Sequence, residues 1–178
     1  MQPTQISSSR RTVLIQINIR WLRQALRLLD IVDESTYRTT RTGAHLRHVV
    51  EFYQCFLDGL EFSHIDYDAR RRDETIERLR EAAAQAIRDT IHTLETEPEL
   101  AGERIVWVRM EDAEANGVRD CFMESSISRE LQILSSHTVH HFALIAMMLR
   151  LQGVDLDADF GVAPSTLRYR AVKTAEAA

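Results

Sequence analysis

The sequence has few of the residues that interrupt helices. Its 178 residues include six glycines and three prolines, so long helices are expected to dominate the fold. No apolar run reaches the roughly 18 residues that a membrane-spanning helix needs. Positive charge is not in excess either, because the formal net charge is -5, whereas nucleic-acid-binding proteins usually carry a basic face. We therefore expect neither a membrane nor a nucleic acid as a partner.

Cysteine is also scarce. The two cysteines, Cys55 and Cys121, lie far apart and match no metal-binding or redox spacing, which predicts reduced thiols inside a cell. The stretch MQPTQISSSRRTV lacks the apolar segment of a signal peptide. Both features predict a cytoplasmic protein.

The rest of the composition is that of an ordinary globular domain. Hydrophobic residues make up 44% of the chain and charged residues 28%. The length suits one domain with a hydrophobic core. We expect a single domain over residues 13–170, with loose termini at 1–12 and 171–178.

Apolar residues recur at helical spacing in four segments. The predicted helices cover about residues 14–32, 42–60, 73–95 and 126–153. The connections at 35–43 and 61–73 are polar, and the tail after Gly153 is expected to be irregular apart from a short turn after Pro164.

A different pattern precedes the last helix. RIVWVRM is rich in β-branched and aromatic residues, Asn116-Gly117 supplies a turn, and RDCFMES can return as a second strand. Ser125 or Ser126 can cap the following helix, and Gly153 can end it. The prediction is an all-α fold, a four-helix bundle with a small β-hairpin insertion before the last long helix.

Three histidines stand at the front of the apolar run SSHTVHHFALIAMMLRLQG. His137 and His141 are four residues apart, so on a helix they project to nearly the same place on the core-facing stripe. Burying each imidazole without a partner costs about 1–3 kcal/mol. A metal ion that uses the neutral imidazole lone pairs removes this cost. The alternative is a pair of hydrogen-bonded core histidines.

A third ligand is expected from a facing helix. The segment 42–60 carries His48 on the same stripe as Phe52 and Cys55, with His45 one turn earlier. His140 lies on another flank of the last helix. His64 and His92 fall outside both clusters and receive no role.

Three segments, in this order, resemble the DinB-like superfamily: GAHLRHVVEFYQCFLDG, IDYDARRRDETIE and SSHTVHHFALIAMMLRLQG. The closing DFGVAPSTLRY is similar to the ending of one branch of it, so the resemblance covers roughly residues 40–170. It implies a four-helix bundle that holds a divalent metal through three histidines. Carried over by position, the ligands are His48, which precedes Val49-Val50, and the pair His137 and His141. His45 and His140 match no ligand position and would have supporting or structural roles.

Three histidine ligands leave at least one coordination position open. Nitrogen ligation suits Zn²⁺ or Ni²⁺, and also Fe²⁺ or Mn²⁺ with added waters. Cys55, two turns from His48, stays open as a further ligand. Such a metal lowers the pKa of a bound water or thiol, or polarises a carbonyl.

The resemblance implies two uses of this site. One is transfer or isomerisation that depends on a low-molecular-weight thiol, such as bacillithiol or mycothiol, and the other is metal-dependent hydrolysis. We favour thiol transfer on an unidentified small-molecule substrate, with catalytic residues unassigned. A non-catalytic, stress-related bundle with a vestigial metal site is the competing class. The run FALIAMMLRL is apolar nearly all round, which predicts deep burial or a homodimer.

Charged residues near the predicted site allow two interpretations each. Either one of the three arginines Arg70, Arg71 and Arg72 reaches over the metal and grips a substrate carboxylate, or all three belong to a solvated charge run, which the sequence favours. Glu51 either orients His48 or acts as a base, or lies on a solvated helix face.

Overall fold

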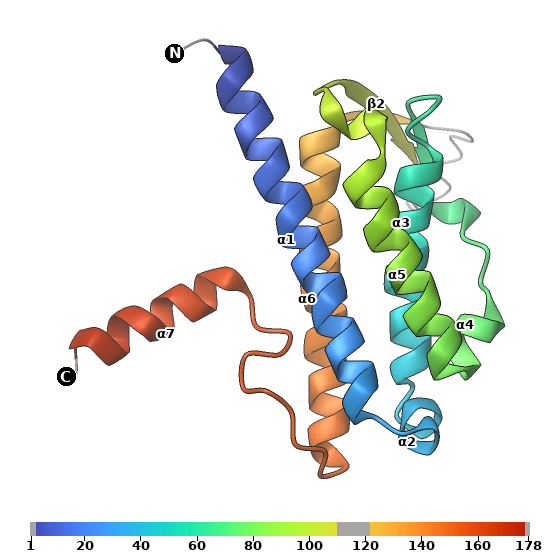
Figure 1. Cartoon of the computed structure of the whole chain (residues 1–178), viewed down its shortest axis with the longest axis vertical. Helices are drawn as coiled ribbons and strands as arrows, with labels where there is room; N and C mark the ends of the chain where they lie inside the picture. The colour runs from blue at the N-terminus through green and yellow to red at the C-terminus, as the bar shows by residue number, and fades with distance from the viewer. Residues whose placement is uncertain (1–2, 110–121, 177–178) are drawn as a thin grey trace, which may run out of the picture.

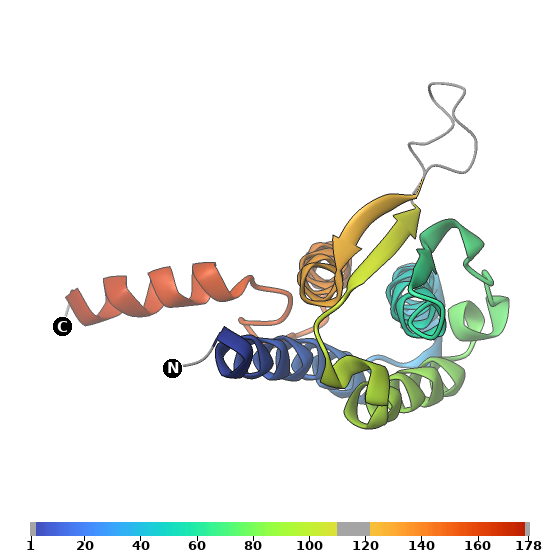
Figure 2. The same ribbon diagram turned by 90° about the horizontal axis from the view of Figure 1, so that it is seen from above.

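The computed structural model describes residues 3–109 and 122–176, which are mostly helical with a small three-stranded sheet. The long helices are α1 (Pro3–Ile31), α3 (Thr42–Asp58), α5 (Arg80–Thr96) and α6 (Ile127–Leu151). Helices α1 and α3 each pack against both α5 and α6 (Figures 1 and 2). This arrangement encloses one hydrophobic core, to which each helix contributes fully buried side chains such as Leu22, Phe56, Ile87 and Leu134.

The sheet covers one end of these helices (Figure 1). Strands β2 (Ile105–Arg109) and β3 (Met123–Ser126) pair antiparallel, as the hairpin prediction requires. The predicted turn at Asn116-Gly117 lies outside the described residues. A third strand, β1 (His64–Asp66), pairs parallel with β2. The sequence did not indicate β1, because a strand of three residues is too short to show an alternating pattern.

Several connections are more ordered than predicted. Helix α2 (Glu34–Thr39) and the 3₁₀ helix η1 (Tyr67–Ala69) occupy the two polar connections. The predicted third helix is divided at Leu79, which has extended backbone angles, into α4 (Glu74–Arg78) and α5. A second 3₁₀ helix, η2 (Pro98–Ala101), follows α5.

Both chain ends were predicted to be loose, and both are helical where the structure describes them. Helix α1 begins at Pro3, and Arg11 anchors it by donating Nε to the carbonyl oxygen of Leu100 at 2.7 Å. A buried arginine that binds a carbonyl 89 residues away leaves no local signal in the sequence. Helix α7 (Pro164–Glu176) has no buried residue, so no apolar stripe could reveal it (Figure 2).

The predicted limits of α6 hold. The Ser126 hydroxyl accepts a hydrogen bond from the backbone N–H of Arg129, which is the N-cap geometry. Gly153, just past the helix, has a φ of 77°, which favours glycine. The apolar run within α6 is divided in burial, since Phe142 and Ile145 are buried and Met147 is exposed. Among the described helices, none has both the length and the apolar character of a membrane span.

A buried polar network joins three helices beside the histidines. The Tyr53 hydroxyl donates to Oδ1 of Asn18 at 2.7 Å and lies 3.1 Å from the Thr138 hydroxyl. Asn18 in turn donates to the carbonyl oxygen of Leu131 at 3.0 Å. Asn18, Tyr53 and Thr138 are each 0% exposed. These bonds fix α1, α3 and α6 relative to one another.

Removing the Tyr53 hydroxyl should therefore destabilise the fold. In Tyr53→Phe, Oδ1 of Asn18 loses its donor inside the core, and the free energy of unfolding should fall by about 1–3 kcal/mol. Urea unfolding followed by circular dichroism measures this change. Tyr169→Phe is the matched control, because Tyr169 is 60% exposed. Equal stabilities of the two variants would show that the network does not hold the helices.

Candidate metal centre

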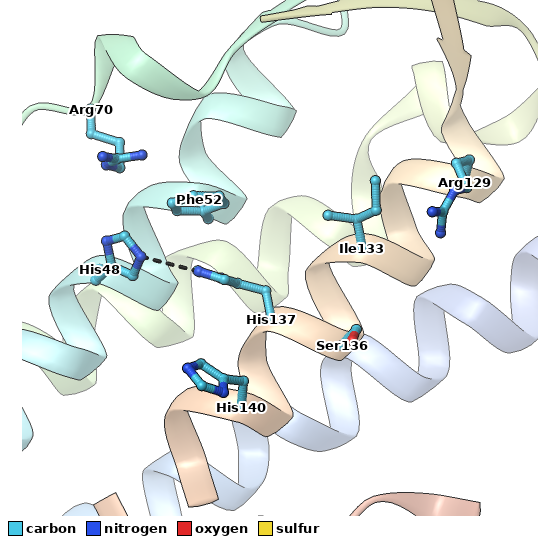
Figure 3. Close-up of a pocket in the computed structure, with 8 residues that line it drawn as sticks. All are labelled: His48, Phe52, Arg70, Arg129, Ile133, Ser136, His137 and His140. Carbon is cyan, nitrogen blue, oxygen red and sulfur yellow. Dashed lines mark hydrogen bonds between the residues drawn. The ribbon is translucent and has the colours of Figure 1, made fainter. Parts of the chain in front are cut away.

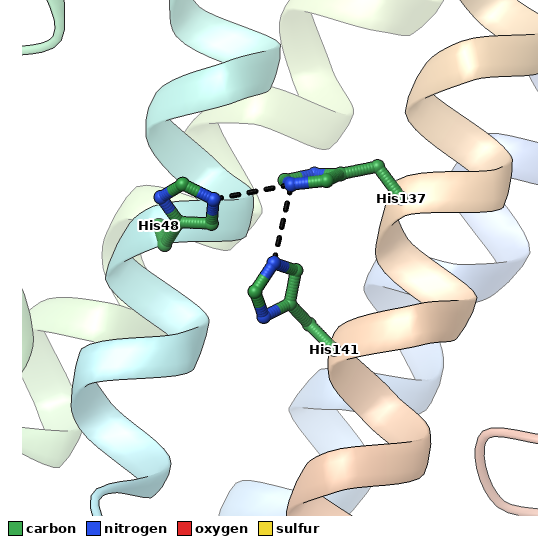
Figure 4. A group of neighbouring side chains, drawn as sticks. All are labelled: His48, His137 and His141. Atoms are coloured by element: carbon green, nitrogen blue, oxygen red, sulfur yellow. Dashed lines mark hydrogen bonds between the residues drawn. The ribbon is translucent and has the colours of Figure 1, made fainter.

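Helices α3 and α6 bring the three predicted ligands together (Figure 4). Nε2 of His137 lies 3.1 Å from Nε2 of His48 and 3.1 Å from Nε2 of His141. One nitrogen of each ring can be chosen so that all three lie within 4.8 Å of one another, and all three side chains are partly buried. His137 and His141 lie one turn apart on α6, and the packing of α3 against α6 brings His48 close to them.

Hydrogen bonds alone do not explain this convergence. Each imidazole nitrogen has either one proton or one in-plane lone pair. Nε2 of His137 can therefore make a good hydrogen bond to one of its two neighbouring nitrogens, but not to both. The remaining contact brings like groups together in a partly buried place, which costs free energy unless something binds between them.

The two nitrogen separations at His137 suit a metal ion. A zinc–nitrogen bond is about 2.0–2.1 Å, which places two nitrogens of a tetrahedral site roughly 3.3 Å apart. The two 3.1 Å separations are close to this value. These three histidines could hold a metal ion, and three ligands leave a position for a further group. Cys55 does not belong to this group of convergent ligand atoms in the described part of the chain.

His45 supports the centre without joining it. Nδ1 of His45 lies 2.9 Å from Nδ1 of His141. If Nε2 of His141 binds a metal, its proton is on Nδ1, which then donates to His45. This bond fixes both the tautomer and the ring orientation of His141. His140, in contrast, is exposed and lies edge-on to His141 with ring centroids 5.2 Å apart.

Stacking orients the ring of His137, whose Nδ1 makes no hydrogen bond to a described residue. Its ring stacks on Phe52 with a centroid distance of 4.0 Å. Nδ1 of His137 is buried and has no hydrogen-bond partner among the described residues. Phe52 also stacks on Tyr67 at 4.9 Å, and the Tyr67 hydroxyl donates to buried Glu130 at 2.8 Å. Tyr67 thus helps to hold Phe52 in place.

Burial keeps the imidazoles of His137 and His141 neutral. It lowers the pKa of His137 to about 4 and that of His141 to about 3, and neighbouring histidines add to both shifts. Burial also lowers the pKa of His45. Neutral rings present the lone pairs that a divalent metal requires.

A cleft of about 630 Å³ opens beside the histidines (Figure 3). Its lining residues are His48, Phe52, Arg70, Arg129, Ile133, Ser136, His137 and His140. Arg129, Ile133 and Ser136 were not predicted from the sequence. Arg129 and Ile133 lie eight and four residues before His137, on the same side of the helix, so helical periodicity was an available signal for these two.

The three arginines of the loop before α4 differ in their surroundings. Arg70 lines the cleft, with Cζ 4.9 Å from the centre of the Phe52 ring. Arg71 is exposed and pairs with Asp58 at 3.0 Å, and Arg72 is exposed as well. The solvated interpretation that the sequence favours therefore suits Arg71 and Arg72 but not Arg70.

The solvated interpretation of Glu51 does not match its place in the structure. Its side chain is 1% exposed, so it does not lie on a solvated face. Oε1 of Glu51 accepts the backbone N–H of Asp73 at 2.7 Å. Since Asp73 caps α4, Glu51 attaches that short helix to α3.

Comparisons with known proteins assign the chain to no family. No family model matches it, and no solved structure matches it. It is similar to FK506-binding protein 5 of Rhizopus delemar, with 30% identity over 105 residues. That match covers 59% of this chain and 27% of the relative, so the chain spans well under two thirds of the relative's length.

The lowered pKa values predict how pH affects the metal-free protein. The folded-state pKa values of His137 and His141 lie below the ordinary 6.5, so the unfolded chain takes up protons first as the pH falls. The free energy of unfolding should therefore decrease from pH 7 to pH 5. In His141→Leu this decrease should be smaller, because one of the two groups is gone.

Thermal unfolding in the presence of a chelator, at several pH values, measures the effect. His92→Leu is the control, because His92 is an exposed histidine outside the site. A decrease that is as steep in His141→Leu as in His92→Leu would contradict the assignment.

Proposed function

We propose that this protein is a metal-dependent enzyme with an open three-histidine site. The observation that carries the proposal is the convergence of His48, His137 and His141 at a cleft large enough for a small molecule. Structural metal sites are usually closed by four protein ligands. Here the three-histidine group adjoins the cleft, where a substrate atom can approach.

The family and the bundle are part of the same proposal. The packing of α1, α3, α5 and α6 supports a four-helix bundle. The spacing of the three histidines, with one on α3 and a pair on α6, supports membership of the DinB-like superfamily. The exposed Met147 and Leu151 of α6 are compatible with a homodimer.

The favoured reaction is transfer of a low-molecular-weight thiol to a small-molecule substrate. Zn²⁺, Ni²⁺, Fe²⁺ or Mn²⁺, when bound, would supply the Lewis acidity that lowers the pKa of the thiol. His48, His137 and His141 would hold the ion, and His45 would keep His141 in the required tautomer. Phe52 and Ile133 give the cleft an apolar part of its wall.

Hydrolysis is the alternative reaction, and the lining of the cleft gives it less support. Activation of water usually uses a general base, often a carboxylate. Among the described residues, no carboxylate lines the cleft. A thiol has an ordinary pKa near 8.5 and needs only a modest shift to ionise at neutral pH.

Metal content tests the site. Elemental mass spectrometry of untagged protein should find close to one equivalent of a divalent metal in the wild type. His48→Ala and His137→Ala should each lose most of it, because two imidazoles hold a metal much more weakly than three. His64→Ala should keep the metal, since His64 lies in β1, outside the site. A wild type that stays metal-free after reloading with Zn²⁺, Ni²⁺ or Mn²⁺ would refute the proposal.

The reaction class has its own test. Metal-loaded protein is mixed with a low-molecular-weight thiol and monochlorobimane, and the fluorescent thioether is measured. Catalysis above the background rate that disappears in His137→Ala supports thiol transfer. Release of p-nitrophenol from p-nitrophenyl acetate without any thiol, combined with no thioether formation, would favour hydrolysis instead.

A further inference from the structure

The charged side chains that are described in the wall of the cleft beside the three histidines are all positive. Arg70 and Arg129 both line it, and no acidic side chain among the described residues does. Their two side chains come from different elements, since Arg70 follows η1 and Arg129 lies in the first turn of α6 (Figure 3). The two cations in the described part of the wall favour a negatively charged ligand.

Arg70 is fixed next to the histidines. Its Nη1 donates to the carbonyl oxygen of Tyr67 at 2.6 Å, and its guanidinium lies over the Phe52 ring, 4.9 Å from the centroid. The same ring stacks on His137 at 4.0 Å and lies 4.8 Å from the ring of His48. The Phe52 ring therefore lies between the guanidinium of Arg70 and the imidazoles of His137 and His48. The positive charge is partly buried, so water screens it less than it screens an exposed arginine.

Arg129 marks the other end of the cleft. It precedes His137 by eight residues on α6, which corresponds to roughly 12 Å along the helix axis. Ile133 lies between the two, so the wall from the histidines to Arg129 is apolar. Arg129 is exposed, and a short ligand that reaches the histidines and Arg70 does not need to reach it.

We propose that the ligand of this site is a low-molecular-weight thiol that carries a carboxylate, and that Arg70 is the residue that selects for the negative charge. This inference rests on the proposed function, because it places the sulfur of the ligand at the three histidines. The carboxylate then lies beside Arg70, and the carbon chain between them lies against Phe52. A planar guanidinium suits a carboxylate because it can offer two parallel N–H groups.

The test compares two thiols that differ in one terminal group, which is a carboxylate in one and a neutral amide in the other. Protein loaded with Co²⁺ is titrated with 3-mercaptopropionate and, separately, with its neutral analogue 3-mercaptopropionamide, and the near-ultraviolet absorption of the cobalt–thiolate complex is measured. In the wild type, the carboxylate should bind about 10-fold more tightly than the amide, as expected for one hydrogen-bonded charge pair. In Arg70→Gln the two dissociation constants should become nearly equal, mainly because binding of the carboxylate weakens.

Two further variants separate charge selection from a structural role. Arg71→Gln should keep the wild-type preference, because Arg71 is exposed and pairs with Asp58 outside the cleft. Arg70→Lys retains the positive charge and should keep part of the preference even if Arg70→Gln folds poorly. Cobalt stoichiometry and thermal unfolding of each variant show whether its site and fold are intact.

The outcomes distinguish this inference from the proposed function. A protein that does not bind Co²⁺ refutes the metal site, and the inference with it. A protein that binds Co²⁺ and both thiols with equal affinity overturns the role of Arg70 and leaves the metal site standing. A preference for the carboxylate that persists in Arg70→Gln also overturns the assignment to Arg70.

Discussion

The register between α3 and α6 is the constraint on which the candidate site depends. His137 and His141 are brought together by one turn of α6, but His48 meets them only if α3 packs at the right height. The hydroxyl of Tyr53 beside Thr138 and the stacking of Phe52 on His137 set that height from the two sides of α3. A shift of α3 by one turn, about 5.4 Å, would remove His48 from reach of the pair.

Packing between apolar helices also explains why the three histidines could hold a metal ion. Burial holds the imidazoles of His137 and His141 neutral, so each offers one lone pair to the same small volume. A proton can bridge only two nitrogens, whereas a divalent metal accepts all three. Phe52 links this centre to Arg70, so the apolar wall of the cleft also carries the positive charge next to it.

The histidine cluster and the long helices were predictable because they depend on local periodicity. A spacing of four residues decides where His137 and His141 point, and apolar stripes reveal α3, α5 and α6. The assignment of His48 in preference to His45 needed the family resemblance, since both lie on the same segment one turn apart.

The features that the sequence did not predict depend on long-range contacts or involve too few residues to form a pattern. Arg11 orders the start of α1 through carbonyls that are distant in the chain, β1 is too short to show a pattern, and α7 buries no side chain. The burial of Glu51 and the separate place of Arg70 follow from how the loop before α4 folds back on α3, which charge patterns do not encode.

The most direct measurement of the central claim is a crystal structure of the metal-loaded protein with anomalous diffraction data collected at the absorption edge of the metal. The account predicts one strong anomalous peak between α3 and α6, about 2.0–2.2 Å from a ring nitrogen of each of His48, His137 and His141, with a coordination position facing the cleft of Arg70. A peak elsewhere on the molecule, or an empty site with the three rings hydrogen-bonded to one another or to water, would contradict it.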